Sequence, residues 1–136
     1  KELKIASPVL PSNAVQGVTF NAGAFTAKLD ITGTDQDDTF TAGAGKNNFT
    51  GGKDKDTFIF AFDNFDADDK VDGGDGKDTL RLTRTGTTID ATTPAALAAI
   101  NGVKNVEVLG FNATTVTVDA TKITAVKEYD FVADTV

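Results

Sequence analysis

The sequence predicts an all-β fold, a right-handed parallel β-roll with one short helix, from three observations. Three phenylalanines, Phe40, Phe49 and Phe58, stand nine residues apart. Each of them follows a turn rich in Gly and Asp, and short apolar alternations recur along the chain at intervals close to nine to eleven residues. A repeat that supplies one turn and one short strand is the signature of a stacked, parallel architecture.

The strands are predicted from apolar residues that alternate with Thr, Asp or Lys over three to five residues. A period of two, bounded by Gly, Asn or Asp, is typical of short β-strands. Equal spacing lets each strand stack on its neighbour and keeps one set of side chains on the core face. The predicted core positions are Val18/Phe20, Leu29/Ile31, Phe40, Phe49, Phe58/Phe60, Leu80/Leu82, Ile89, Val106/Val108, Val116/Val118 and Ile123.

The short helix is predicted near residues 94–101. Thr93 is suited to cap its N-terminus, and Pro94 to occupy its first turn. Residues 95–100 are good helix formers, and Asn101-Gly102 supplies the stop. We expect this helix to cover an edge of the core.

One domain, residues 1–136, is expected from the length. It comprises an extended lead-in at 1–17, the repeats at 33–82, and a region at 83–136 of rungs without metal and a cap. The stretch 60–72 lengthens one repeat: Phe60 and Phe62 are expected to extend the strand begun at Phe58, and the acidic part to form an outward loop. Because the chain starts with Lys and has no signal peptide, we expect it to be excised from a larger protein.

The composition restricts the chemistry that is possible. There is no Cys and no His, so thiolate sites and the usual neutral-pH base are absent, which leaves a set of oxygen ligands. Of the 17 aspartates, 13 lie between Asp30 and Asp78, and this clustering favours a site over general solubility. A net charge of −7 and the lack of a long apolar run argue against nucleic acid as a partner and against membrane insertion.

The spacing of the turns predicts how they stack. Two nonapeptides complete one coil, so the turn at 33–38 is expected to lie on the turn at 51–56, about one strand spacing (~4.8 Å) away. Asp38 and Asp56 would then face each other. By the same count the turn at 42–47 would face the turn at 73–78, which pairs Asn47 with Asp78.

Stacked acidic turns of this kind suit Ca²⁺. The ion takes six to eight oxygen ligands at ~2.3–2.6 Å, which two carboxylates and four inward carbonyls can supply. Without the ion the stacked aspartates repel each other, so metal binding and folding are expected to be one event. The alternative, Asx and Gly turns without metal, explains neither the fixed period of nine nor the recurring apolar residue.

The pattern resembles the RTX (repeats-in-toxin) family of secreted bacterial proteins over the four repeats from Gly33 to Leu82, and Gly73-Gly74-Asp75-Gly76-Lys77-Asp78-Thr79-Leu80 fits the family consensus throughout. In that family the sixth residue of a repeat is a side-chain ligand, and the second and fourth give carbonyls. The resemblance implies a Ca²⁺ site with side chains from Asp38, Asp56, Asp78 and, more weakly, Asn47, and with carbonyls from Thr34, Gln36, Gly43, Gly45, Gly52, Asp54, Gly74 and Gly76.

Two departures from the family pattern stand in these turns. Gln36 and Asp54 occupy positions where the family has Gly, which affects the turn geometry of the first site. Asn47 replaces an Asp, so the second site has one carboxylate fewer and should bind more weakly. The acidic side chains of the inserted stretch are expected to form a solvated loop rather than a site; they are Asp63, Asp66, Asp68 and Asp69.

Three classes of function follow. The favoured one is a calcium-dependent structural module of a secreted or cell-surface bacterial protein, of the surface-layer or RTX-adhesin type. Its partners would be calcium ions and, at the unpaired end strands, other segments of the parent protein or a second copy. The alternative is the C-terminal RTX translocation domain of an exported protease or lipase. An enzyme is not expected, because nucleophilic triads have no support; a glycan-binding surface at Phe62, Phe65 and Tyr129 is a weaker possibility.

Overall fold

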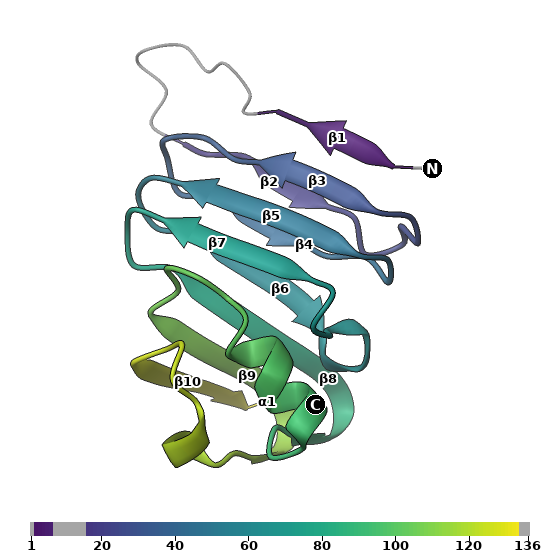
Figure 1. Ribbon diagram of the computed structural model, residues 1–136, viewed down its shortest axis with the longest axis vertical. Coiled ribbons are helices and arrows are strands. Elements are labelled where there is room, and N and C mark those ends of the chain that lie inside the picture. The colour runs from purple at the N-terminus through teal and green to yellow at the C-terminus, as the bar shows by residue number, and fades with distance from the viewer. Residues whose placement is uncertain (1, 7–15, 134–136) are drawn as a thin grey trace.

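The computed structural model describes residues 2–6 and 16–133 and shows a mostly β protein whose strands are parallel and lie in two sheets (Figure 1). Over these residues there are ten strands, one α-helix and two short 3-10 helices. In chain order they are β1 (Leu3–Ile5), β2 (Thr19–Asn21), β3 (Leu29–Thr32), β4 (Thr39–Thr41), β5 (Asn47–Gly52), β6 (Thr57–Ala61), η1 (Phe62–Asn64), β7 (Lys70–Gly74), β8 (Thr79–Asp90), α1 (Pro94–Ile100), β9 (Val108–Thr117), η2 (Ala120–Lys122) and β10 (Glu128–Ala133).

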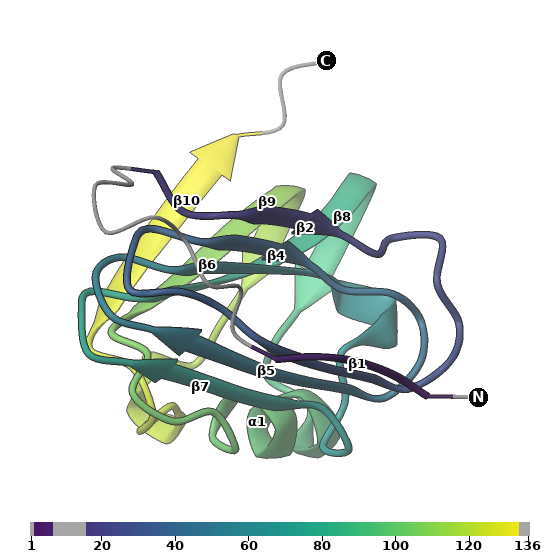
Figure 2. The ribbon, with the colours of Figure 1, turned by 90° about the horizontal axis from the view of Figure 1, so that it is seen from above.

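The two sheets face each other, and from β1 to β8 successive strands alternate between them (Figures 1 and 2). One sheet has the order β1-β3-β5-β7 and the other β10-β9-β8-β6-β4-β2. Leu29 pairs with Asn47, and Thr39 with Thr57, each eighteen residues on. Two nonapeptides therefore make one rung, which we define as one strand from each sheet, and this spacing confirms the expected stacking of the first turn on the third.

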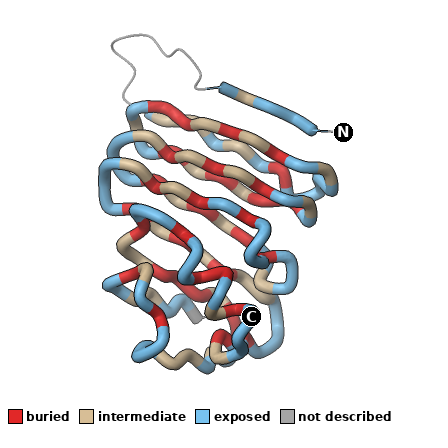
Figure 3. Tube along the Cα trace, viewed as in Figure 1, coloured by how far each residue is buried: buried red, intermediate tan, exposed pale blue. Residues whose placement is uncertain are grey.

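The core between the sheets is built from the recurring apolar residue of the repeat. Phe40, Phe49 and Phe58 are fully buried. The rings of Phe40 and Phe58 stack with centroids 5.1 Å apart, and Phe49 from the opposite sheet stacks 5.4 Å from Phe40. Buried and partly exposed residues alternate along these strands (Figure 3). This alternation is what a period of two predicts for strands with one face on a core.

The stretch 60–72 is not simply an outward loop. Its end enters β7, which pairs with β5 and places Val71 opposite Phe49. Val71 stands two residues after Asp69 and two before Gly73, as Phe49 stands two residues after Asn47 and two before Gly51. The pairing partners Asn48 and Lys70 are twenty-two residues apart instead of eighteen, and these extra residues hid the repeat in the sequence.

Beyond Leu82 the expected series of separate rungs does not continue. Leu80, Leu82 and Ile89 all lie in β8, which has a register shift between Arg84 and Thr88 where it pairs with β9. Val108 and Val116 likewise share β9, and Ile123 follows η2 instead of lying in a strand. The strands β8, β9 and β10 are consecutive neighbours in one sheet. Two long strands, β8 and β9, thus replace the turn-strand period here.

The predicted helix is confirmed as α1. The Thr93 hydroxyl accepts a hydrogen bond from the Ala96 amide at 3.2 Å, and Asn101 occupies the C-cap. The helix lies beside the β7 edge of the four-stranded sheet (Figures 1 and 2). In the lead-in, residues 3–5 form β1 and pair with β3, whereas residues 7–15 lie outside the described part of the chain.

Within the described residues, no helix has the length and apolar character needed to cross a membrane.

Candidate metal site

The turns between the sheets stack in two sets on opposite sides of the molecule (Figure 1). One set, which we call the carboxylate edge, precedes β4, β6, β8 and β9. The other, which we call the amide edge, precedes β5 and β7. The residues that end the turns are Asp38, Asp56, Asp78 and Glu107 at the carboxylate edge, and Asn47 and Asp69 at the amide edge.

The carboxylate edge is a continuous ladder of hydrogen bonds from backbone to side chain. The Val18 amide donates to Asp38 Oδ1 at 2.6 Å, and the Asp38 amide donates to Asp56 Oδ1 at 2.7 Å. The Asp56 amide in turn donates to Asp78 Oδ1 at 2.7 Å, and the Asp78 amide to Glu107 Oε2 at 3.0 Å. Each carboxylate therefore contacts the backbone of the segment that precedes it at this edge.

This ladder corrects one predicted pairing. Asp78 lies next to Asp56, not opposite Asn47, because β7 takes the place beside β5 that the turn at 73–78 was expected to fill. The expected proximity of Asp38 and Asp56 is confirmed. Glu107, which was not among the predicted site residues, continues the same series of carboxylates. Its signal in the sequence is Leu109, which stands two residues later, as Leu80 stands after Asp78.

At the carboxylate edge, the Oδ2 oxygens of the aspartates do not all accept hydrogen bonds as their Oδ1 oxygens do. Asp38 Oδ2 accepts the Thr34 amide at 2.5 Å, and the Thr34 hydroxyl reaches Asp38 Oδ1 at 3.0 Å. By contrast, Asp56 Oδ2 and Asp78 Oδ2 are buried and have no hydrogen-bond donor among the described residues. Both residues are 0% exposed. A buried charged oxygen without a partner is costly, by roughly 1–3 kcal/mol or more.

Burial also changes the acidity of these groups. Loss of hydration raises the pKa of Asp56 to about 7, helped by the charges of Asp38 and Asp78 and opposed by the hydrogen bond from the Asp38 amide. Loss of hydration raises the pKa of Asp78 as well, and the charge of Glu107 adds to it. Both carboxylates are therefore poorly stabilised as anions by the protein alone, and a cation beside them would reverse this.

Carbonyl oxygens approach the glycines of the next turn at the same edge. A Cβ on Gly52 would overlap the Thr34 carbonyl oxygen, and a Cβ on Gly74 would overlap that of Gly52. Both glycines have positive φ, 139° and 98°. The Thr34 carbonyl accepts the Lys53 amide at 3.3 Å and the Gly52 carbonyl accepts the Asp75 amide at 3.0 Å. Each carbonyl has a second lone pair that could serve a metal ion.

Asp54 has a positive φ although it is not a glycine. Its φ is 61°, in the left-handed region, whereas Gly76, at the same position of the next turn, has φ 153°. A Cβ on Gly76 would overlap the Asp54 carbonyl oxygen. The fourth-position carbonyl of the turn at 51–56 is thus directed at the following turn despite the departure from the family pattern.

The amide edge is built differently. The backbone amide of Asn47 donates to Asp69 Oδ1 at 2.8 Å. Its side-chain Nδ2 shares its two hydrogens among three oxygens: the Gly43 carbonyl at 3.2 Å, the Gly45 carbonyl at 2.6 Å and Asp69 Oδ1 at 2.9 Å. The two carbonyls expected to be ligands therefore contact an amide. Asp69, expected to be solvated, is only 7% exposed and is the true neighbour of Asn47.

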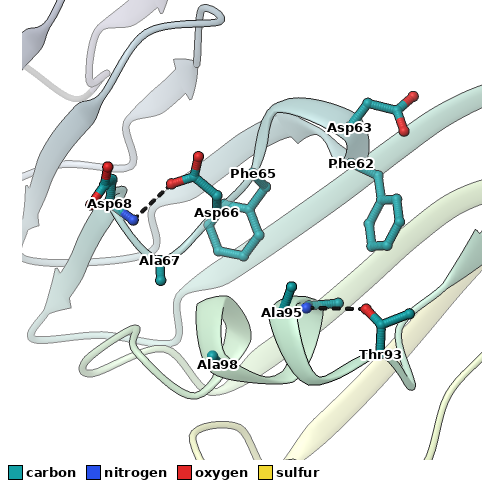
Figure 4. Close-up of a pocket in the computed structure, with 10 residues that line it drawn as sticks. Phe62, Asp63, Phe65, Asp66, Ala67, Asp68, Thr93, Ala95 and Ala98 are labelled. Atoms are coloured by element: carbon teal, nitrogen blue, oxygen red, sulfur yellow. Dashed lines mark hydrogen bonds between the residues drawn. The ribbon is translucent and has the colours of Figure 1, made fainter.

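A hollow of about 460 Å³ between η1 and α1 is a separate candidate for binding (Figure 4). It contains Phe62 and Phe65, but Tyr129 lies in β10 and does not line it. Phe65 is buried against Phe60 with ring centroids 4.9 Å apart, and the Arg84 guanidinium covers the Phe62 ring at 5.8 Å. The three aromatic residues weighed as glycan contacts are not brought together.

The donor set at the carboxylate edge fits Ca²⁺ in kind. Its atoms are all oxygens, two of them are buried carboxylate oxygens with no donor among the described residues, and carbonyls of successive turns stack along the same edge. In residues 2–6 and 16–133, no group of three or more His, Cys, Asp and Glu side chains is arranged to hold a metal ion. A bound ion would therefore depend mainly on backbone carbonyls.

Comparison with known proteins gives no match, whether with protein-family models, with curated proteins or with solved structures.

Proposed function

We propose that this chain is a calcium-dependent structural module of a secreted or cell-surface bacterial protein, folded as a right-handed parallel β-roll of the RTX type. The observation that carries the proposal is the pair of buried oxygens, Asp56 Oδ2 and Asp78 Oδ2, which lack a hydrogen-bond donor among the described residues. A rigid apolar core can bury such oxygens only if something compensates their charge.

Two gaps between stacked turns are the proposed calcium positions. The first lies between the turns at 33–38 and 51–56, with the side chains of Asp38 and Asp56. The second lies between the turns at 51–56 and 73–78, with the side chains of Asp56 and Asp78. Carbonyls of the second and fourth residues of these turns would complete each site: Thr34, Gln36, Gly52, Asp54, Gly74 and Gly76.

The electrostatics support coupling between calcium and folding. Adjacent ionised carboxylates about 5 Å apart repel by roughly 3 kcal/mol at an effective dielectric of about 20. The carboxylate edge has four acidic groups in succession, so the repulsion between them accumulates along it. Calcium supplies positive charge and satisfies the carbonyls, which makes its binding energy part of the folding energy. Extracellular calcium modules work at millimolar concentration, which suits a protein that orders outside the cell.

A structural role follows from how the chain is used. The repeated turns and strands build the sheets themselves, and the acidic side chains that could do chemistry are buried in the turn stack. The chain has no His or Cys to act as a neutral-pH base or a thiol nucleophile. The proposed work of the carboxylates is therefore to hold rungs together through calcium.

Thermal unfolding followed by circular dichroism tests this function. The full chain is compared in millimolar Ca²⁺, in millimolar Mg²⁺ and in chelator. Two ions bound at a hundred times their Kd would add about 5 kcal/mol, a rise in Tm of roughly 20 °C. Mg²⁺ should give little of this effect, because it demands smaller, octahedral sites. Superimposable unfolding curves in calcium and chelator would refute the function.

A further inference from the structure

We infer that the Nδ2 nitrogen of Asn47 occupies the place of a cation at the amide edge, so that this edge is closed without metal. The inference rests on the proposed function, since it takes the carboxylate edge as the one that binds calcium. Asn47 stands at the sixth position of its repeat, as Asp38, Asp56 and Asp78 do in theirs. A single change of side chain would thus separate the two edges.

The contacts of this nitrogen are those a bridging ion would make. Two are carbonyls of its own turn, the second-position Gly43 at 3.2 Å and the fourth-position Gly45 at 2.6 Å. The third is Asp69 Oδ1 of the next rung at 2.9 Å. The amide therefore connects the carbonyls of one turn to the carboxylate of the following turn. At the carboxylate edge no such donor reaches Asp56 Oδ2 from the described residues.

The orientation of the amide is set by these oxygens. If the amide were rotated by half a turn, Asn47 Oδ1 would face three oxygens with no hydrogen between them. In the structure, Asn47 Oδ1 instead accepts no hydrogen bond from the described residues, although Asn47 is only 1% exposed. The hydrogen bonds of the nitrogen offset that cost, so the Asn47 side chain is held in place by Nδ2 and not by Oδ1.

The carboxylate of Asp69 is fully engaged by donors. Its Oδ1 accepts both the backbone amide and the Nδ2 of Asn47, and its Oδ2 accepts the Asp66 amide at 3.1 Å. Loss of hydration raises the pKa of the Asp69 carboxyl, and these three donors oppose that rise, as a cation would elsewhere. Both oxygens of this carboxylate already accept hydrogen bonds, so its burial does not require a metal ion. The number of calcium ions per chain is then set by the carboxylate edge alone.

The variant Asn47→Asp tests the inference. An aspartate there would oppose three oxygens, so in chelator its Tm should fall by roughly 10 °C below the wild type, and Ca²⁺ should restore it. Calorimetric titration with Ca²⁺ alone should count one ion more than in the wild type. The control is Asn48→Asp, which adds the same charge on the adjacent residue, outside the turn; it breaks the hydrogen bond from Asn48 Nδ2 to Asp30 Oδ1, so its stability should fall alike in chelator and in Ca²⁺. It should leave the ion count unchanged.

Two results would overturn the inference: an Asn47→Asp variant with the wild-type ion count and wild-type stability in chelator, or a wild-type crystal with calcium among the Gly43 carbonyl, the Gly45 carbonyl and Asp69 Oδ1. A wild type that binds no calcium at all would instead refute the proposed function. Even then, a gain of one calcium ion in the Asn47→Asp variant would support the inference about the amide edge.

A second measurement needs no variant. In calcium-saturated wild type, the side-chain amide protons of Asn47 should exchange with solvent at least about a hundredfold more slowly than those of Asn101, whose Nδ2 donates to Lys122 O at the surface. Equal exchange rates for the two side chains would contradict the inference, because the amide of a residue that is 1% exposed and donates to three oxygens must be protected.

Discussion

The carboxylate edge and the amide edge carry equivalent turns, yet their buried oxygens have different partners. At the amide edge, every oxygen of Asp69 accepts a hydrogen bond, and the carbonyls of Gly43 and Gly45 accept the Asn47 side chain. At the carboxylate edge, Asp56 Oδ2 and Asp78 Oδ2 accept none from the described residues. The same backbone frame thus holds one set of turns whose carboxylate is satisfied by protein donors and one set with two carboxylate oxygens that have no donor among the described residues.

The difference shows how one residue position can assign a metal requirement. An amide at the sixth position brings its own hydrogens, whereas a carboxylate brings two acceptors to a place that is already rich in acceptors. Burial makes the second choice costly unless a cation is present. The following predictions test whether the two edges respond to calcium as differently as their partners suggest.

The largest effect is expected for Asp56→Asn, and its sign should depend on calcium. In chelator at about pH 8, removal of a carboxylate whose pKa is raised to about 7 should stabilise the protein, by up to about 4 kcal/mol. In saturating calcium the same variant should be less stable than the wild type, because a ligand is lost. Urea denaturation in both conditions measures this.

The control for that variant is Asp35→Asn. Asp35 pairs with Lys53 at 2.6 Å on the surface, and both side chains are more than half exposed. Its loss should change stability by no more than about 1 kcal/mol in either condition. An Asp56→Asn effect of the same sign in calcium and in chelator would remove the distinction between the edges.

The pH dependence without calcium should be nearly as large. The folded protein keeps a proton on Asp56 up to about pH 7, whereas the unfolded chain releases it near pH 4. Between these values the folded state binds more protons, so the free energy of unfolding should fall as pH rises, by up to about 4 kcal/mol in total. Denaturation in chelator across this range measures the slope, and Asp56→Asn should reduce it, because the raised pKa values of Asp69 and Asp78 leave a further contribution.

Protons and calcium should compete for the same carboxylate. The apparent calcium affinity should therefore rise with pH until Asp56 is fully ionised, above about pH 7. Calorimetric titrations at several pH values measure this rise. A calcium affinity that is constant over the range would mean that the ion does not bind at Asp56.

An intermediate effect is expected at the amide edge for Asp69→Ala. The change leaves the Asn47 backbone amide, the Asn47 Nδ2 and the Asp66 amide without this acceptor, which should cost about 2–3 kcal/mol. The loss should be the same in calcium and in chelator, because no ion is involved. Urea denaturation under both conditions tests it, and a loss confined to calcium would place a metal at this edge.

The smallest effect is expected for Asp54→Gly. Asp54 has a left-handed φ of 61°, which costs a non-glycine residue roughly 1 kcal/mol. Glycine should relieve most of this strain while it keeps the carbonyl that faces Gly76. The variant should therefore be slightly more stable, with an unchanged calcium response in thermal unfolding. A weakened response would show that the Asp54 side chain contributes to binding.

The period of nine was sufficient to predict the stacking of equal repeats. It correctly placed Asp56 beside Asp38, because an unbroken spacing of eighteen leaves the register no freedom. It failed at Asp69 and Val71, where extra residues in the turn conceal a repeat that is present in the structure. Matching the repeat backwards from Gly73 through Val71 would have identified Asp69 as its sixth-position residue and so found this rung.

Features that depend on side-chain orientation could not be predicted from spacing. The sequence placed Asn47 among weak calcium ligands, but its contacts depend on which amide atom faces the turn and on Asp69 from the next rung. Glu107 was missed because its turn is shortened: the Gly73 amide already bonds Lys104 O, three residues before Glu107. Such a turn has no room for the Gly-rich pattern that marks the others.

One experiment tests the central claim most directly: anomalous scattering from crystals of the full chain grown in calcium. The account predicts peaks within about 2.3–2.6 Å of Asp56 Oδ2 and Asp78 Oδ2 and none beside the Asn47 amide. Well-ordered turns with no peak at either aspartate would contradict it.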